Sequence, residues 1–407
     1  MTETTGTQLP EMRFDPEFYR DPYPGYAERR DQGPVHRATM PMGLDMWVVT
    51  RYEDVKAALG NPALSRDYRV YGEVLDRKLG NSSARVASAS AFDAHMLNSD
   101  PPDHTRLRRL VGKAFTVRTT ERLRPRVQEL TGDLLDAMAS RGEADLIAEF
   151  ALPLPIMVIC ELLGVPLPDQ ARFREMFEAI FSNSARPEDR GRAARELTGY
   201  LTDLIAAKRA DPREDLLSEL VAVRDGSDRL SEHELMSMAF LLIAAGHETT
   251  VNLIGNGALA LLTHPEQLSA VRADPELMPR AVEEFLRYDS PVHMASVRVA
   301  TSPLHIGGVE IPAGELVLLS LAAADRDPER FPDPDTLDVT RDAKGHLAFG
   351  HGIHHCIGAH LGRVEGIVAL GMLVERFPGL RLAVPVGELR WNHNILFRGV
   401  EELPVVL

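Results

Sequence analysis

The pattern of hydrophobic and polar positions predicts a mostly helical chain with a few short strands. Helical periodicity is clear at 52–59 and 281–288, and further helical stretches run from 104 to about 208. Short apolar runs bounded by glycine and proline predict strands at 47–50, 297–300, 304–306, 309–311 and 316–319, and a final hairpin made of 380–384 and 395–398. The pattern therefore indicates the mainly α class with small peripheral β-sheets.

The longest predicted helix starts at the N-cap residue Ser231 and ends at His264, ahead of Pro265, so it is about 50 Å long. Residues 238–245 are apolar on every side, which predicts burial all round. The sequence then becomes polar at 246–250, which read Gly-His-Glu-Thr-Thr. Glycine and threonine weaken a helix in its middle, and such a conflict in a buried helix is expected where function is located.

Residues 349–358 are a second unusual stretch, because they combine three glycines and three histidines with Cys356, one of only two cysteines. Backbone N–H donors, a helix N-terminus and a metal charge all keep a metal-binding thiolate deprotonated. A single axial cysteine holds haem iron where the chemistry is O–O cleavage. Two alternatives are open: a Gly/His-rich loop with a buried free cysteine, and a zinc site with ligands from His351, His354, His355, Cys356 and His360.

A basic segment follows the Asp-Pro-Pro turn at 100–102. His104 and Arg108 are four residues apart, so they share one helix face and suit a buried anionic group such as a haem propionate. A solvated basic face explains the arginines equally well. Cations continue to Arg126 against a single acid, Glu121, which reverses the sign of charge locally in a chain of net charge −15.

Composition limits the class of protein. The net charge of −15 argues against a nucleic-acid binder, and two cysteines in 407 residues exclude a disulfide framework. The N-terminus lacks a signal-peptide pattern, and the longest apolar run, at 238–245, is far shorter than the roughly 20 residues that span a bilayer. We therefore expect a cytoplasmic protein with no nucleic-acid or membrane partner.

Four motifs resemble those of the cytochrome P450 family and occur in its order. They are Asp-Pro-Pro-x-His-Thr-Arg-Leu-Arg at 100–108, Ala-Gly-His-Glu-Thr-Thr at 245–250, Glu-Phe-Leu-Arg at 284–287 and Phe-Gly-x-Gly-x-His-x-Cys-x-Gly at 349–358. The similarity extends from about Phe14 to the C-terminus and is to the soluble bacterial branch, many of whose members tailor macrolides. It implies a polar tail at 1–13 and a single P450 domain at 14–407, with a long central helix over a b-type haem.

The resemblance implies a role for each matching residue. Cys356 would be the proximal ligand of the haem iron, Thr249 would hydrogen-bond dioxygen, and Glu248 would pass protons from water. Many relatives carry Asp where this chain has Glu248. A structural set would join Glu284 and Arg287 to Arg341. The other cofactor-binding residues would be His104, Arg108, Ala245, Arg298, Phe349, Gly350, His354 and Gly358.

The resemblance also implies the reaction and its partners. One oxygen atom from O₂ would enter a C–H bond of a neutral lipophilic molecule, and electrons would come from NAD(P)H through a reductase and an acidic ferredoxin to a monomeric enzyme. The expected substrate contacts are Leu242, Ala245, Val292, Met294, Ile395 and Leu396. The expected ferredoxin-docking residues are Arg109, Lys113, Arg122 and Arg363.

Other outcomes of the same haem-thiolate chemistry are open. Epoxidation, C–C coupling and peroxide-driven oxidation are alternatives to hydroxylation. A non-catalytic haem-based ligand sensor is a further alternative, although a sensor has no need of the proton relay that Glu248 and Thr249 would form.

Overall fold

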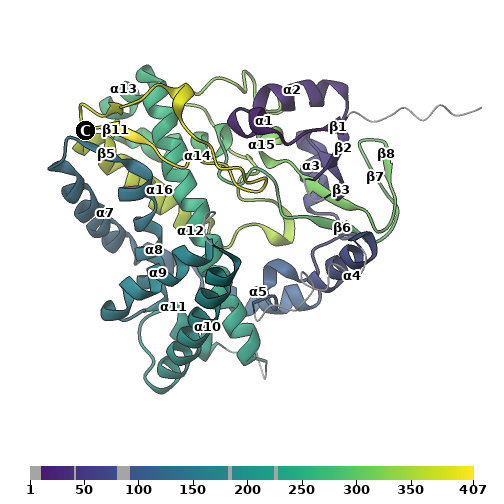
Figure 1. The fold of residues 1–407 in the computed structure, drawn as a ribbon, viewed down its shortest axis with the longest axis horizontal. Coiled ribbons are helices and arrows are strands. Elements are labelled where there is room, and N and C mark those ends of the chain that lie inside the picture. The colour runs from purple at the N-terminus through teal and green to yellow at the C-terminus, as the bar shows by residue number, and fades with distance from the viewer. Residues whose placement is uncertain (1–10, 41–42, 80–91, 182–185, 224–227) are drawn as a thin grey trace, which may run out of the picture. The chain divides into compact units, whose positions relative to one another are not determined.

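A computed structural model gives the fold (Figure 1) and describes residues 11–40, 43–79, 92–181, 186–223 and 228–407. Most of the polar tail predicted at 1–13 lies outside these residues. The chain forms two compact units that alternate along the sequence, and a single domain at 14–407 stays a prediction. The sheet unit contains Met1–Ser88, Gly255–Cys356 and Pro385–Glu401, and the helical unit contains Ala89–Ile254, Ile357–Val384 and Glu402–Leu407.

A six-stranded sheet in the order β1-β2-β3-β9-β6-β4 organises the sheet unit. Its strands are β1 (Glu11–Met12), β2 (Val35–Thr39), β3 (Asp45–Val49), β4 (Leu64–Ser65), β6 (Arg298–Ala300) and β9 (Leu316–Leu319), and β7 (Leu304–Ile306) pairs with β8 (Val309–Ile311) apart from it. The helices of this unit are α1 (Pro16–Arg20), α2 (Tyr23–Gln32), α3 (Tyr52–Leu59), α4 (Tyr68–Leu79), α13 (Pro265–Ala273), α14 (Met278–Tyr288) and α15 (Leu321–Asp325), with short turns η5 (Pro275–Leu277), η6 (Gly352–His354) and η7 (Val386–Glu388).

Strand β9 lies at the centre of the sheet unit because both of its faces are covered. All four of its side chains are buried, and alternate side chains of a strand point to opposite faces. The first and third residues join a hydrophobic cluster with Phe18 of α1 and Tyr26 of α2, whereas the second and fourth join one with Val55 of α3. Figure 1 shows these helices around β2 and β3. Each such buried side chain is worth roughly 1.5–3 kcal/mol relative to exposure.

The hairpin predicted at 304–306 and 309–311 is confirmed as β7 and β8, which pair antiparallel. Gly307 and Gly308 make its turn with φ of +55° and +81°. Side chains disfavour these dihedrals, and a Cβ on Gly307 would also lie 2.2 Å from Cγ of Pro34. The two glycines are therefore the local reason for the turn.

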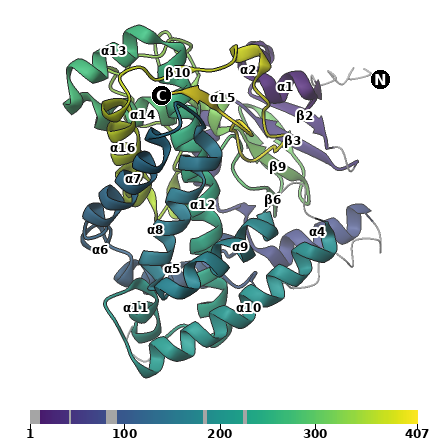
Figure 2. The ribbon, with the colours of Figure 1, turned by 60° about the vertical axis from the view of Figure 1, so that its left-hand side comes forward.

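The helical unit is built from antiparallel and crossing helices with one small sheet. Figure 2 shows α9 beside α10, the two helices of this unit with the most extensive contact. Its elements are η2 (Met96–Asn98), α5 (Asp103–Ala114), α6 (Val117–Glu121), α7 (Arg124–Ala139), η3 (Ile147–Ala151), α8 (Pro153–Leu163), η4 (Leu167–Asp169), α9 (Gln170–Phe181), α10 (Pro187–Ala210), α11 (Leu216–Ala222) and α16 (Ala359–Arg376), with strands β5 (Glu143–Asp145), β10 (Arg381–Leu382) and β11 (Pro404–Val406).

The long helix predicted from 231 to 264 is confirmed as α12 (Glu232–Thr263), which starts in the helical unit and ends in the sheet unit. Among the described residues, α12 is one helix that is long and apolar enough to cross a membrane. However, 61% of its most apolar window is buried inside the protein, as in the core helix of a globular fold. Burial all round is wrong at three positions of 238–245, because Ala245 is exposed and Phe240 and Ala244 are half-buried.

The predicted C-terminal hairpin is wrong in its second strand. Strand β10 pairs antiparallel with β11, not with residues 395–398. The backbone of that segment instead bonds to the distant residues 291–293, since Leu396 O accepts from His293 N at 2.7 Å and Arg398 N donates to Pro291 O at 3.0 Å. Pairing between segments far apart in sequence cannot be inferred from a short apolar run.

Candidate active site

The Cys356 loop belongs to the sheet unit and is shaped by its own backbone. Cys356 N donates to Phe349 O at 2.9 Å, which closes the loop. Gly350 and Gly352 have φ of +70° and +73°. A Cβ on Gly352 would lie 3.2 Å from Cα of Gly60, so this glycine lets the loop approach the end of α3 closely. Cys356 is exposed at the end of this loop, and Gly358 follows as the N-cap of α16.

The other cysteine has the opposite environment. Cys160 is 2% exposed in α8, and burial raises the pKa of its thiol to about 12. A thiol with that pKa stays protonated at neutral pH and is a poor metal ligand. Of the two cysteines, only Cys356 therefore has the exposure that a metal ligand needs.

The predicted structural set is brought together in the sheet unit. Arg287 donates from Nε and Nη2 to the two carboxylate oxygens of Glu284 at 2.7 and 2.8 Å, and Arg341 Nε reaches the same carboxylate at 3.2 Å. Glu284 and Arg287 are fully buried. Arg287 also donates to backbone carbonyls of Asp325 and Pro334, so its guanidinium ties α14 to the segment after α15.

A buried carboxyl that sequence reasoning missed supports the start of the Cys356 loop. Asp325 Oδ1 accepts from Leu347 N at 2.6 Å, while its Oδ2 is buried without a hydrogen-bond partner. Burial raises the pKa of Asp325 to about 7, against the opposing effects of His346, Arg287 and Arg330. Nothing in the sequence marks this aspartate, because its partner is a backbone N–H 22 residues away.

The remaining predicted residues of the sheet unit lie along its sheet and C-terminal turn. Arg298 is 4% exposed on β6 and donates to Leu64 O at 3.4 Å. Val292 forms an isolated β-bridge with Phe397. Met294 is fully buried in the same cluster as Phe18, and Ile395 and Leu396 are half-buried against that cluster. Phe349 and His354 are half-buried.

In the helical unit, α5 carries the predicted anion-binding pair. The helix begins at Asp103 after Pro102, and His104 and Arg108 lie one turn apart on it. His104 is 3% exposed, and its pKa is lowered by burial first and by the charge of Arg108 second. A neutral imidazole beside a half-buried guanidinium is a suitable donor pair for a carboxylate.

The polar segment of α12 also lies in the helical unit. Thr249 Oγ1 donates to Ala245 O at 2.6 Å, so the hydroxyl bonds to the carbonyl one turn back. Burial raises the pKa of the Glu248 carboxyl, which favours its protonated form relative to an exposed glutamate. Leu242 is buried one turn before Ala245, which is exposed.

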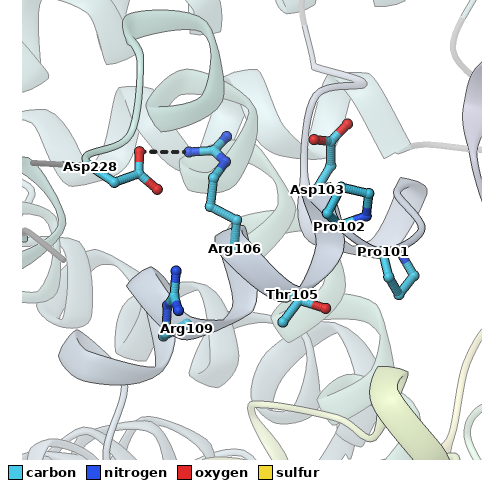
Figure 3. A pocket seen from close by; sticks show the side chains of 7 residues that line it. All are labelled: Pro101, Pro102, Asp103, Thr105, Arg106, Arg109 and Asp228. Atoms are coloured by element: carbon cyan, nitrogen blue, oxygen red, sulfur yellow. Dashed lines mark hydrogen bonds and ion pairs between the residues drawn. The ribbon is translucent and has the colours of Figure 1, made fainter. Parts of the chain in front are cut away.

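A hollow at the start of α5 is lined by prolines and by polar and charged residues. It is about 640 Å³ and is lined by Pro101, Pro102, Asp103, Thr105, Arg106, Arg109 and Asp228 (Figure 3). Arg106 bonds to Asp228 at 3.3 Å and also pairs with Glu234 of α12. Because its walls are prolines and ions, this hollow does not have the lining that a lipophilic substrate requires.

Comparison with known proteins identifies the family. The cytochrome P450 family model matches residues 33–380. Cytochrome P450 107B1 of Saccharopolyspora erythraea is 50% identical over 402 residues, 99% of each chain, and cytochrome P450 monooxygenase PikC of Streptomyces venezuelae is 50% identical over 394 residues, 96% of this chain and 92% of PikC. The ligand-free P450 monooxygenase TamI has a TM-score of 0.90 at 48% identity, covering 98% of this chain and 94% of TamI.

The chain belongs to the cytochrome P450 family. It has the P450 fold and is a monooxygenase, an oxidoreductase with a haem-thiolate cofactor.

The residues present fit the haem of a P450. Cys356 is an exposed thiol on a glycine-shaped loop that leads directly into α16. Ala245 is an exposed small residue on a helix that is largely buried, which suits the approach of a flat cofactor. The zinc alternative fails, because the described residues contain no group of three or more His, Cys, Asp or Glu that could hold a metal ion.

Proposed function

We propose that this P450 inserts one oxygen atom from O₂ into a C–H bond of a neutral lipophilic molecule of the polyketide or macrolide type. The observation that carries the proposal is the Glu248–Thr249 pair, which lies close to exposed Ala245 and follows the apolar run 238–245 of α12. An acid and a hydroxyl in such a helix have no packing role and are the groups that controlled proton delivery requires. A ligand sensor has no use for them.

We propose haem b as the cofactor, with Cys356 as the iron ligand. His104, Arg108 and Arg298 bind the propionates as donors, and Ala245, Phe349, Gly350, His354 and Gly358 complete the binding residues. When bound, a haem held by the Cys356 thiolate would supply the O–O cleavage chemistry. The backbone bond from Cys356 N to Phe349 O holds the loop in the conformation that presents the thiol.

Glu248 and Thr249 handle protons in this proposal. Thr249 Oγ is held 2.6 Å from Ala245 O, so its hydroxyl can exchange that bond for one to dioxygen. Glu248 is half-buried, and its raised pKa means that a larger fraction of it is protonated and able to donate than of an exposed carboxyl. It takes protons from water and passes them toward Thr249.

Substrate contacts are proposed at Leu242, Ala245, Val292, Met294, Ile395 and Leu396. Met294 is fully buried in a hydrophobic cluster, and Ile395 and Leu396 pack against that cluster. These side chains carry no charge, so a neutral ligand held by burial suits them. A protein of this kind works as a cytoplasmic monomer in our proposal.

Electrons are proposed to come from NAD(P)H through a reductase and an acidic ferredoxin. Arg109, Lys113 and Arg122 are exposed on α5 and after α6, and half-buried Arg363 lies on α16, which packs against α6. In the same segment, Arg124 pairs with Glu121 and Arg126 pairs with Glu129 and Glu161. Such cations raise the encounter rate with an acidic partner.

The test is oxygenation of a macrolactone panel under isotopically labelled dioxygen. Macrolactones that displace the water ligand in the haem spectrum are incubated with NADPH, a surrogate ferredoxin and its reductase. We expect a product that carries a single labelled oxygen atom. Binding without oxygenation by any panel member, in a protein with an intact thiolate spectrum, would contradict the proposed function.

A further inference from the structure

The start of α8 departs from α-helical geometry immediately beside the proposed proton-handling segment. Residues Ile147–Ala151 form a π-helix, in which Leu152 N donates to Ile147 O at 2.8 Å. The sequence explains it, because Pro153 and Pro155 lack the N–H groups that the carbonyls of 149 and 151 would accept in an α-helix. Single π-turns of this kind are frequent at functional sites.

The π-turn ends at a carbonyl that binds helix α12. His247 Nε2 lies 3.2 Å from Leu152 O, and His247 is 6% exposed. Burial lowers the pKa of His247 to about 4, so the ring is neutral at neutral pH. A neutral ring that bonds a carbonyl through Nε2 carries its proton on that nitrogen, so the bond runs from His247 to Leu152.

A second contact joins the same two helices one residue earlier. A Cβ on Gly246 would lie 3.4 Å from Cδ1 of Ile159, so this glycine packs closely against α8. Leu152 and Ile159 are seven residues apart, about two turns of helix, and therefore lie on one side of α8. Helix α12 is thus held against α8 at both residues that precede Glu248.

The Glu248–Thr249 segment needs support from outside the helix. The Thr249 hydroxyl competes for the Ala245 carbonyl, and such back-bonding weakens and bends a helix. Rotation of α12 about its axis at this point would turn both side chains away from their working direction. A fixed contact at the preceding residue removes that freedom.

We propose that His247 is a positioning residue that fixes the rotation of the Glu248–Thr249 segment by bonding α12 to the π-helical start of α8. This inference rests on the proposed proton-handling role of Glu248 and Thr249. His247 does not touch substrate in it; the donor at Nε2 acts through the backbone of α12.

The test compares His247→Phe, which keeps the ring volume without a donor, with His247→Gln, whose amide N–H has a reach similar to Nε2. The matched control is His233→Phe, the same change at an exposed position on the first turn of α12. The readout independent of turnover is the infrared C–O stretch of the reduced CO complex, which reports the polar groups facing the ligand. The second is product formed per NADPH with a macrolactone from the panel.

We expect His247→Phe to broaden or shift the C–O band and to lower product per NADPH roughly twofold to tenfold, the loss expected for one hydrogen bond. His247→Gln should restore both, and His233→Phe should change neither. An unchanged C–O band and coupling in a folded His247→Phe protein would overturn the proposal. Thr249→Ala distinguishes failure of the proposed function from failure of the His247 proposal. Wild-type product per NADPH in Thr249→Ala would contradict the proton-handling role. The C–O band of His247→Phe would still test whether His247 positions the segment.

Discussion

The Cys356 loop and the polar segment of α12 are supported in different ways. The loop is held by backbone hydrogen bonds. Just before it, Leu347 N donates to Asp325, whose own carbonyl accepts from fully buried Arg287. The α12 segment depends on single side-chain bonds from His247 and Thr249 to carbonyls. The difference suggests that damage to the loop's support should cost folding and haem retention, whereas damage to the α12 segment should cost only the efficiency of the reaction.

The largest effect is expected when Arg287 is replaced by methionine. The Glu284 carboxylate would lose its closest cation while fully buried, a change that typically costs about 3–5 kcal/mol. Denaturant unfolding and haem content measure it. The control is Arg376→Met, which breaks an exposed pair with Asp136 and should cost under about 1 kcal/mol. Equal losses of unfolding free energy and haem content in the two variants would mean that the buried Glu284–Arg287 pair does not support the Cys356 loop.

Thr249→Ala should leave folding and haem content intact and divert electrons to peroxide. Product per NADPH should fall by roughly tenfold or more, since a positioned proton donor is commonly worth at least that factor. Thr263→Ala is the matched control, because Thr263 makes the same hydroxyl-to-carbonyl bond near the end of α12. Peroxide and product are measured together. If Thr249→Ala forms as much product per NADPH as the wild type, proton delivery depends on another group.

Asp325 gives the loop's support a pH dependence. Its folded pKa of about 7 lies above the value in an unfolded chain, so the native state binds the proton more tightly. This contribution to stability is complete below about pH 4 and is lost as pH rises through 7, at about 1.4 kcal/mol per pH unit. Asp325→Asn should remove that slope from unfolding curves between about pH 4 and 7. Exposed Asp342→Asn should keep it, and a slope that persists in Asp325→Asn would refute the assignment.

The smallest effect is expected at the proposed docking residues. Reversal of Arg109, Lys113 or Arg122 to glutamate should slow ferredoxin-driven reduction several-fold at low salt, because steering is screened over roughly 8 Å at physiological ionic strength. Exposed Arg381 on β10 lies outside this segment, and its reversal should have no effect. The measurement is the stopped-flow rate of haem reduction by ferredoxin at two salt concentrations. Unchanged rates in all three charge-reversal variants would place the docking site elsewhere.

Local patterns were enough to predict most elements, and contacts between distant segments were not. The glycine pair at 307–308 and the apolar run of α12 determine structure through neighbouring residues, so periodicity and turn chemistry predicted both. The pairing of β10 with β11, the bond from His247 to Leu152 and that from Leu347 to Asp325 join segments far apart in sequence. All three use backbone groups, which leave no mark in a residue pattern. The exposure of Ala245 also depends on distant segments, because it is set by which side chains pack over this part of α12.

The central claim, that Cys356 is the thiolate ligand of a P450 haem, is tested most directly by the CO difference spectrum of the reduced protein. Cys356→Ser should lose the far-red-shifted thiolate band. Cys160→Ser, in which a buried thiol of raised pKa is replaced, should keep it. A thiolate band that survives in Cys356→Ser would contradict the account.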